Sequence, residues 1–198
     1  MSLIEVLLTP LGWLLRGKKA GEESAYKHYP QLQTRNLFEL SSPAFKNEGK
    51  IPRKHAGLGR GENISPELRW TILPKGTKQL LLVMEDIDVP LKKPILHMVV
   101  LFGPAFERMP EGALTPDNTE ITFLPGRKGR VGYHGPRALP GHGIHRYWFH
   151  LYALDEWIPI NDNYRNFEQL LPRVNGHVIG SGHLEGVSAF YPFALGKK

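Results

Sequence analysis

Asp86 and Asp88 are the first sign of chemistry in this sequence, because two carboxylates stand two residues apart at the end of an apolar run. The run Leu80–Met84 predicts a buried strand, and the acidic stretch Glu85–Pro90 (EDIDVP) that follows predicts carboxylates at the rim of a cavity. Alternate residues of a strand face the same way, so Asp86 and Asp88 are predicted to share a face. Two such carboxylates repel each other unless a proton or a positive group lies between them.

A second polar segment, Gly135–Tyr147 (GPRALPGHGIHRY), places His145 and Tyr147 two residues apart at the start of another apolar run, and a third element supplies His97. The two histidines are the natural counterparts of the carboxylates, since a nearby carboxylate favours imidazolium. A charged His145, the Tyr147 hydroxyl and free backbone N–H groups of the Gly135–Gly143 loop would offer donors to an oxyanion. These segments therefore predict a pocket that accepts phosphate, a phosphomonoester or a carboxylate.

Simpler explanations and other chemistries compete with an anion pocket. A lone Asp-x-Asp after a strand commonly forms a turn, and a lone histidine in an apolar run is commonly a hydrogen-bonded core residue. A metal site is a second alternative, but no HExxH or two-histidine-carboxylate motif supports it, and we predict no bound metal and no other cofactor. The candidate metal ligands are Asp86, Asp88, His97, His142 and His145.

Catalysis is a further alternative that the sequence leaves open, although we lean towards a protein that is not an enzyme. Nucleophilic hydrolysis is disfavoured because there is no Gly-x-Ser-x-Gly motif and no serine in either segment. General acid/base catalysis stays open, since a histidine held by a carboxylate is what proton transfer beside a carbonyl requires. Its catalytic residues would be Asp86, His97 and His145. The other histidines are interpreted as loop or strand residues, namely His134, His142, His150, His177 and His183.

The composition favours one β-rich globular domain. A chain of 198 residues can bury a full core, and 17 prolines with 21 glycines predict many turns and few long helices. The absence of cysteine excludes disulfides and favours a cytoplasmic location. A net charge of +6 favours anionic partners, but no basic stripe with interleaved aromatic residues and no zinc-finger spacing is present, so we predict no nucleic-acid partner.

Short apolar runs separated by turn residues predict an all-β fold, a sandwich with a few peripheral helices. One helix is predicted over Asp162–Val174, capped by Asn161 or Asp162. The predicted strands are Phe38–Leu40, Leu68–Ile72, Gln79–Met84, Leu96–Phe102, Ile121–Leu124, Arg146–Leu154 and His183–Phe190.

The N-terminal segment is predicted to precede the main domain as a short apolar stretch and an arm. Residues 1–36 comprise the apolar stretch Met1–Leu15 and a polar connecting arm, and the domain proper covers 37–198. The apolar stretch is too short to span a bilayer, and Glu5 and Pro10 interrupt it, unlike a signal peptide. We favour a terminal helix packed on its own domain or on a homodimer mate; the alternative is a helix that contacts a membrane surface or a protein partner.

Several motifs in chain order resemble the phosphatidylethanolamine-binding protein family, and the chain is similar to its bacterial-type and fungal cytosolic members over residues 37–195. The motifs are Leu40–Phe45 (LSSPAF), Glu62–Trp70 (ENISPELRW), Leu82–Pro90 (LVMEDIDVP), Leu96-His97, Tyr133–Pro136 and Gly143–Tyr147. The resemblance implies an antiparallel Greek-key β-sandwich with a pocket for phosphate or a phospholipid head group. Carried over by motif, its ligand-binding residues are Asp86, Asp88, Pro90, His97, Gly135, Pro136, His145 and Tyr147.

The family resemblance also frames the expected function. It implies a small-anion or phospholipid-head-group binding protein that regulates a protein partner, with Arg146 in a structural ion pair with a motif acid such as Asp88. Fungal relatives suggest the alternative, an enzyme or accessory protein of secondary metabolism that moves a proton on a carboxylate or anhydride metabolite. The sequence departs from the family pattern at Ile87, Val89 and Met98, which alter one wall of the pocket.

Overall fold

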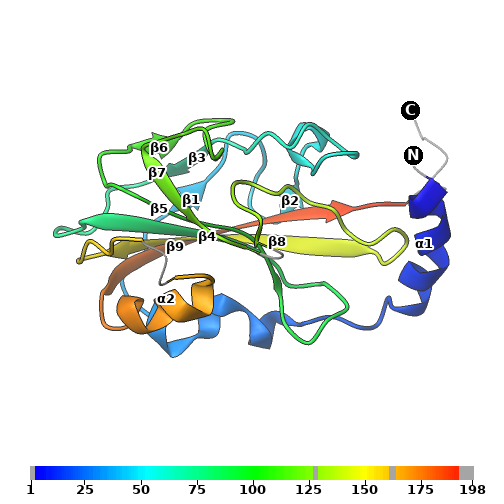
Figure 1. The fold of residues 1–198 in the computed structure, drawn as a ribbon, viewed down its shortest axis with the longest axis horizontal. Helices are drawn as coiled ribbons and strands as arrows, with labels where there is room; N and C mark the ends of the chain where they lie inside the picture. Colours follow the sequence, from blue (N-terminus) through cyan, green and yellow to red (C-terminus); the bar gives the residue numbers. More distant parts are fainter. Residues whose placement is uncertain (1–2, 127–128, 161–163, 192–198) are drawn as a thin grey trace.

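The computed structural model describes residues 3–126, 129–160 and 164–191, in which β-strands form most of the regular structure. A six-stranded sheet has the order β2-β9-β8-β4-β5-β7, and a three-stranded sheet has the order β1-β3-β6. Figure 1 shows the small sheet above one face of the large sheet and helix α2 below the other. The strands are β1 (Leu40–Ser41), β2 (Gly49–Lys50), β3 (Leu68–Trp70), β4 (Gln79–Asp86), β5 (Ile95–Phe102), β6 (Arg108–Met109), β7 (Ile121–Leu124), β8 (Ile144–Leu154) and β9 (Val178–Ala189). The helices are α1 (Leu3–Leu14) and α2 (Phe167–Val174), with short 3-10 turns η1 (Glu22–Ser24), η2 (Tyr26–His28), η3 (Pro30–Leu32) and η4 (Arg53–His55).

Strand β4 lies at the centre of the fold and belongs to both hydrophobic cores. All eight of its residues are buried, as its continuous apolar run predicts. Leu80 and Leu82 pack in the core that contains the small sheet, whereas Leu81 and Val83 pack in the core that contains α2. Each such side chain contributes roughly 1.5–3 kcal/mol when fully buried. The register of β4 with β8 is therefore strongly fixed, and so is the position of the residues at their ends.

The predicted strands are found in the predicted order, with two additions and one correction. The two-residue strands β2 and β6 were not predicted, because two residues carry no recognisable alternation. The expectation of a purely antiparallel arrangement is wrong, because β2 pairs parallel with β9 through Gly49↔Gly186 and Lys50↔Val187. These strands are far apart in sequence, so no hairpin dictates their relative direction.

Helix α2 is shorter than the helix predicted over Asp162–Val174. It begins at Phe167, because the side chain of Asn166 caps it by accepting a hydrogen bond from the Gln169 backbone N–H at 3.0 Å. The predicted caps Asn161 and Asp162 lie outside the described residues. The apolar face of α2 packs in the lower core, as its helical periodicity predicts.

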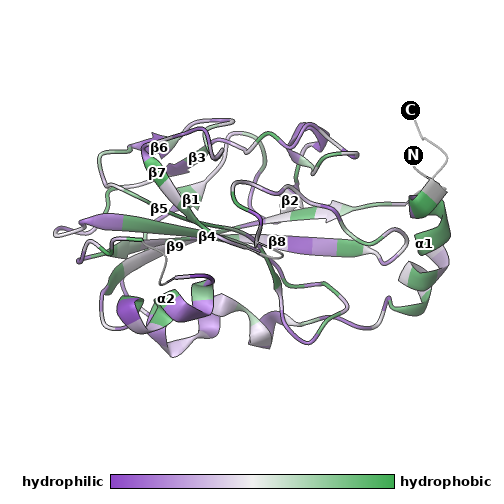
Figure 2. Ribbon diagram, viewed as in Figure 1, coloured by the Kyte–Doolittle hydropathy of each residue, from purple (hydrophilic) through white to green (hydrophobic). Residues whose placement is uncertain are grey.

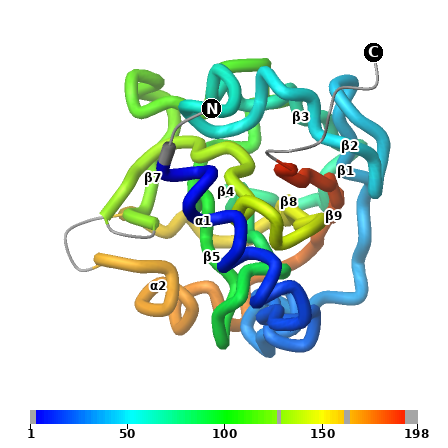
Figure 3. The backbone as a smooth tube through the Cα atoms, turned by 90° about the vertical axis from the view of Figure 1, so that its right-hand side faces the viewer, coloured from blue at the N-terminus to red at the C-terminus, as the bar shows by residue number. Residues whose placement is uncertain are grey.

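The N-terminal segment packs against the domain at two places. Helix α1 lies across the end of the large sheet where β8 begins (Figures 1 and 3). The following residues, expected as a connecting arm, run along the lower face and bury Tyr26 and Leu32 in the core beside α2. Backbone bonds from Ala20 to the Val89 carbonyl and from Gly21 to the Ile87 carbonyl, at 2.9 and 3.0 Å, join this segment to the loop after β4. No helix within the described ranges is long and apolar enough to cross a membrane.

Candidate functional site

Asp86 and His145 form a buried ion pair at the edge where β4 ends and β8 begins. Antiparallel pairing sets Asp86 opposite Tyr147, and the Asp86 carboxylate lies 2.8 Å from Nδ1 of His145. The two side chains are only 3% and 1% exposed. Strand alternation turns His145 and Tyr147 to the same face, as predicted, and their rings stack with centroids 6.4 Å apart. The carboxylate, the imidazole and the phenol are therefore brought together.

A β-bulge brings His97 to this cluster. The register of β4 with β5 runs from Met84↔Met98 to Glu85↔Leu96, so β5 has one extra residue, His97, at this point. The imidazole of His97 consequently lies edge-on to the Tyr147 ring at a centroid distance of 5.2 Å. Its Nδ1 lies 2.6 Å from the His134 carbonyl oxygen, which only accepts, so Nδ1 carries the proton.

The hydroxyl of Tyr147 is buried and meets no acceptor in full hydrogen-bond geometry among the described residues, although the Asp86 carboxylate and the Arg137 backbone lie close to it. Burial raises the pKa of Tyr147 well above 10, and the neighbouring Asp86 carboxylate raises it further. The phenol therefore keeps its proton at neutral pH. A buried O–H group without a partner is costly, typically by about 1–3 kcal/mol, and such a group is relieved when a ligand accepts from it.

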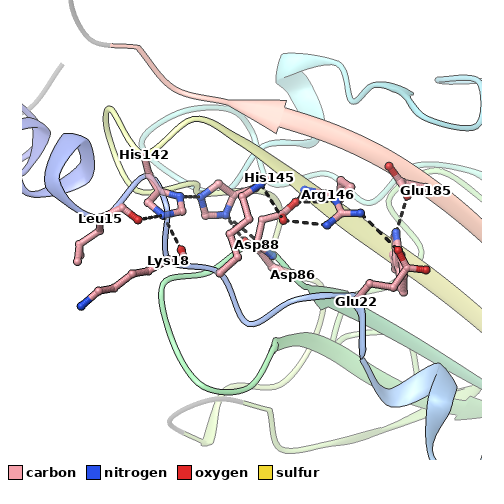
Figure 4. A network of polar contacts seen from close by, with 11 residues as sticks. Leu15, Lys18, Glu22, Asp86, Asp88, His142, His145, Arg146 and Glu185 are labelled. Atoms are coloured by element: carbon pink, nitrogen blue, oxygen red, sulfur yellow. Dashed lines mark hydrogen bonds and ion pairs between the residues drawn. The ribbon is translucent and has the colours of Figure 1, made fainter. Parts of the chain in front are cut away.

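His142, interpreted from the sequence as a loop or strand histidine, extends the ion pair into a chain of hydrogen bonds (Figure 4). Its Nδ1 lies 2.8 Å from Nε2 of His145, and its Nε2 lies 2.8 Å from the Leu15 carbonyl oxygen and 3.0 Å from that of Lys18. The two carbonyl groups come from more than 120 residues earlier in the chain. Nothing local in the sequence marks this contact.

A proton count fixes the charge of this chain. Carbonyl oxygens accept, so Nε2 of His142 donates, and the bond between Asp86 and His145 holds a second proton. The bond between the two imidazoles needs a third. The three hydrogen bonds thus need three protons. An ionised Asp86 with two neutral imidazoles would supply only two. With Asp86 ionised, the histidine pair carries one positive charge.

Asp88 does not join this cluster, and the prediction that it shares a face with Asp86 is wrong. The strand ends at Asp86, whose Oδ1 accepts from the Asp88 backbone N–H at 3.0 Å and so forms a turn. The Asp88 carboxylate instead accepts from Nε and Nη2 of Arg146 at 2.9 and 3.0 Å and pairs with Lys19 at 3.0 Å. The predicted structural pair of Arg146 with Asp88 is thus present in the structure.

In the Gly135–Gly143 loop, two of the backbone N–H groups that we expected to be free donors already donate to other groups of the protein. The Gly135 N–H donates to Oδ1 of Asn63 at 2.9 Å, and the Gly141 N–H donates to the Phe190 carbonyl at 3.0 Å. These two are therefore not the free donors that we expected of the loop. A Cβ at Gly135 would lie 2.0 Å from the His55 carbonyl oxygen, so this position needs glycine for close approach. Pro136 is buried beside it, and Pro90 is half-buried in the loop after β4.

The metal alternative finds no support in the geometry. Among the described side chains, no group of three or more His, Cys, Asp or Glu residues is arranged to hold a metal ion. Asp88 points away to Arg146, so one of the candidate ligands is directed elsewhere.

A second polar cluster lies on the opposite face of the large sheet, and sequence reasoning missed it. Glu85 is fully buried and its Oε1 lies 2.9 Å from Nε2 of His150, whose Nδ1 lies 2.7 Å from Nδ1 of His183. The Tyr26 backbone N–H donates to both Glu85 oxygens, at 3.1 and 3.2 Å. His150 and His183 line an open hollow of about 530 Å³ that also contains Trp148 and Lys27.

Comparisons with known proteins agree on the family. The family described as "Phosphatidylethanolamine-binding protein" matches residues 41–189. The UPF0098 protein of Methanothermobacter thermautotrophicus is 35% identical over 153 residues, which cover 75% of this chain and 96% of the relative. The UPF0098 protein of Aquifex aeolicus is 32% identical and covers 76% of this chain and 88% of its own length.

Solved structures give the same result. A phosphatidylethanolamine-binding protein homologue from Chlamydia trachomatis superposes with a TM-score of 0.67 at 32% identity, over 77% of this chain and 97% of the homologue. Escherichia coli YbcL, described as a member of the mammalian family, has a TM-score of 0.70 at 24% identity and shares the fold over 77% of this chain and 98% of its own. The chain belongs to the phosphatidylethanolamine-binding protein family.

Proposed function

We propose that the cluster of Asp86, His97, His145 and Tyr147 binds a small anion, either free phosphate, the phosphate of a phospholipid head group or a carboxylate. The observation that carries the proposal is the buried Tyr147 hydroxyl, which stays protonated and has no acceptor in full hydrogen-bond geometry among the described residues. It lies beside the hydrogen-bonded pair of His145 and His142, whose positive charge balances the negative charge of Asp86. An anion supplies a well-placed acceptor for this donor.

Access to the cluster requires the N-terminal segment to give way. His142 ties Nε2 of His145 to the backbone of Leu15 and Lys18, and Arg16 Nε donates to the Gly141 carbonyl at 2.8 Å. These contacts close the site over the side chains of Asp86, His145 and Tyr147, which are buried, whereas His97 is half-buried. We infer that an anion binds when His142 releases His145, because the freed Nε2–H then points to the ligand.

The binding proposal is tested by calorimetric titration of phosphate, phosphorylethanolamine and a small dicarboxylate into the wild type, His145→Ala and Tyr147→Phe. We expect saturable binding that weakens at least tenfold in His145→Ala, because a charge-assisted hydrogen bond contributes about 1.5–3 kcal/mol. Tyr147→Phe keeps the ring and removes only the donor, so it tests the site without disturbing the core. His28→Ala, an exposed histidine elsewhere, is the matched control.

The phosphate and phosphorylethanolamine titrations separate a site for the free anion from a site for a lipid head group. A head-group site binds phosphorylethanolamine more tightly than phosphate, whereas a simple anion site does not distinguish them. Folded variants that bind all three probes as the wild type does would refute the proposal.

His142→Ala is expected to strengthen phosphate binding by a factor of about 2–10, since it removes one internal hydrogen bond that competes with the ligand. Calorimetry against the His28→Ala control measures the change. Weaker binding in His142→Ala would contradict the closing role and make His142 a ligand contact instead.

A proton-transfer function is the second candidate, because the Asp86 carboxylate lies 2.8 Å from Nδ1 of His145 and could hold the ring in a fixed orientation. This arrangement suits a general acid or base acting on a carboxylate or anhydride metabolite. Turnover of such a probe with a pH-dependent rate that His145→Ala abolishes would favour it over simple binding.

A further inference from the structure

Helix α1 packs with its polar residues inward and its apolar residues outward. Glu5 and Thr9 are 7% and 1% exposed, whereas five large apolar residues have exposed fractions from 44% to 80% and Val6 and Leu8 are half-buried. The five exposed residues are Ile4, Leu7, Leu11, Trp13 and Leu14. Figure 2 shows this helix as a largely hydrophobic element at the end of the molecule. Ile4, Leu7, Leu11 and Leu14 recur at the helical spacing of three and four, so they form one continuous stripe.

Specific contacts on the inward side of α1 fix the orientation of the helix, and this orientation exposes the apolar stripe. Glu5 pairs with Arg60 at 3.1 Å, and both side chains are about 10% exposed or less. A Cβ at Gly12 would lie 1.8 Å from the Pro140 carbonyl oxygen, so only glycine permits this approach. The contacts of α1 thus hold its orientation and leave the stripe facing solvent.

The charge beside the stripe indicates what covers it. Arg16, Lys18 and Lys19 follow the helix, and all three are exposed, although Lys19 also pairs with Asp88 and Arg16 Nε donates to the Gly141 carbonyl oxygen. Between residues 3 and 19 the only acidic residue is Glu5, which faces inward. A second copy of the chain would cover the stripe, but its own segment 3–19 offers these basic residues no acidic partner, because Glu5 faces inward. An anionic surface with an apolar interior matches both features at once.

We propose that α1 docks in the plane of a membrane that contains anionic lipid. Its 12 residues span about 18 Å, too short to cross a bilayer but suited to lie in the interface. Trp13 is exposed beside the stripe and is of the residue type favoured at the membrane interface, and the exposed Lys18 would lie near the head groups. The residues that match the family begin at 41, so this surface belongs to the part of the chain outside that match.

The test is flotation of the full chain with phosphatidylcholine vesicles, with and without phosphatidylserine. We expect binding only to the vesicles with phosphatidylserine, and weakening as the salt concentration rises. The double variant Leu7→Glu/Leu14→Glu is expected to lose at least tenfold in binding, and Lys18→Gln about fivefold. A double variant at exposed apolar sites near β1 and β3, Leu37→Glu/Ile72→Glu, is the matched control and should bind like the wild type.

Fluorescence locates the contact on α1. A blue shift of tryptophan emission on vesicle binding is expected in the wild type and should be largely lost in Trp13→Phe, which still floats with the vesicles. Equal binding to vesicles with and without phosphatidylserine would overturn the proposal. So would a dimer in sedimentation that Leu7→Glu/Leu14→Glu dissociates while no vesicle binds.

The result is separable from the anion-binding proposal. The outward residues Leu7 and Leu14 take no part in the Asp86–His145 cluster, so Leu7→Glu/Leu14→Glu is expected to bind phosphate in calorimetry as the wild type does. Loss of vesicle binding with phosphate binding intact supports membrane docking by α1.

Discussion

Glu85→Ala is expected to lower the free energy of unfolding by about 3–5 kcal/mol, the typical cost of removing one partner of a buried ion pair. The carboxylate is fully buried and is the partner of both His150 and the Tyr26 backbone N–H. Alanine leaves two buried polar groups without an acceptor and opens space in a closely packed strand. Urea denaturation followed by circular dichroism measures the loss.

Two further variants separate the causes of that loss. Glu85→Gln keeps the shape and an acceptor for Tyr26 but removes the charge opposite His150, so we expect an intermediate destabilisation. Glu23→Ala removes an equal charge from an exposed position nearby and should change stability by less than about 0.5 kcal/mol. A Glu85→Ala protein within 1 kcal/mol of the wild type would show that the buried Glu85–His150 contact contributes little.

The same cluster explains why β8 tolerates polar residues in its interior. His150 is itself buried between Phe149 and Leu151, and Glu85 on β4 supplies its hydrogen-bond partner. Tyr152 lies on the same face, where burial and then the charge of Glu85 raise its pKa well above 10. Glu85 is therefore the one carboxylate to which both His150 and Tyr152 on this face of β8 respond.

Much of the fold follows from local pattern, because continuous apolar runs are long enough to identify β4, β5 and β8. The pairing of Asp86 with His145 follows from the same pattern, since both residues stand at strand ends and alternate residues share a face. The position of Asp88 could not be derived in this way, because alternation stops where the strand stops. Strand β4 ends there because the Asp86 side chain accepts a hydrogen bond from the Asp88 backbone N–H.

Two other features of the site depend on contacts that no local pattern records. His97 reaches Tyr147 only because a bulge adds one residue to β5, and a bulge leaves no reliable mark in an apolar run. His142 joins the site only because α1 carries Leu15 and Lys18 back across the sheet end. The apolar sequence of α1 predicts a helix, but which side of that helix faces the domain depends on its contacts in the folded structure.

Closure of the anion site and docking of α1 involve the same segment. The outward stripe of α1 and the inward contacts of residues 15–19 with His142 and Asp88 lie on consecutive turns of the chain. Binding of the α1 stripe to a membrane would therefore act on the contacts of residues 15–19 that close the anion site. Asp88 is the strongest of these anchors, because it is bound by two cations and a backbone N–H.

Asp88→Ala is accordingly expected to lower the free energy of unfolding by about 2–3 kcal/mol, because it removes the acceptor shared by Arg146 and Lys19. The loss is smaller than for Glu85→Ala, because Arg146 and Lys19 are 31% and 43% exposed and water can solvate them. Asp117→Ala, an exposed aspartate without this network, is the matched control. Urea denaturation at neutral pH compares the three proteins.

The pH dependence of that loss identifies its cause. Burial raises the pKa of Asp88, but hydrogen bonds from Arg146 and Lys19 outweigh it and lower the pKa from 3.8 to about 2. A carboxyl with a depressed pKa in the folded state stabilises the protein above its unfolded pKa and loses this contribution as the pH falls towards 2. The stability difference between wild type and Asp88→Ala should therefore stay constant from neutral pH to about 5 and then narrow by about 2 kcal/mol in acid. A difference that does not change with pH would mean that packing, and not the ion pair, holds the N-terminal segment to the loop after β4.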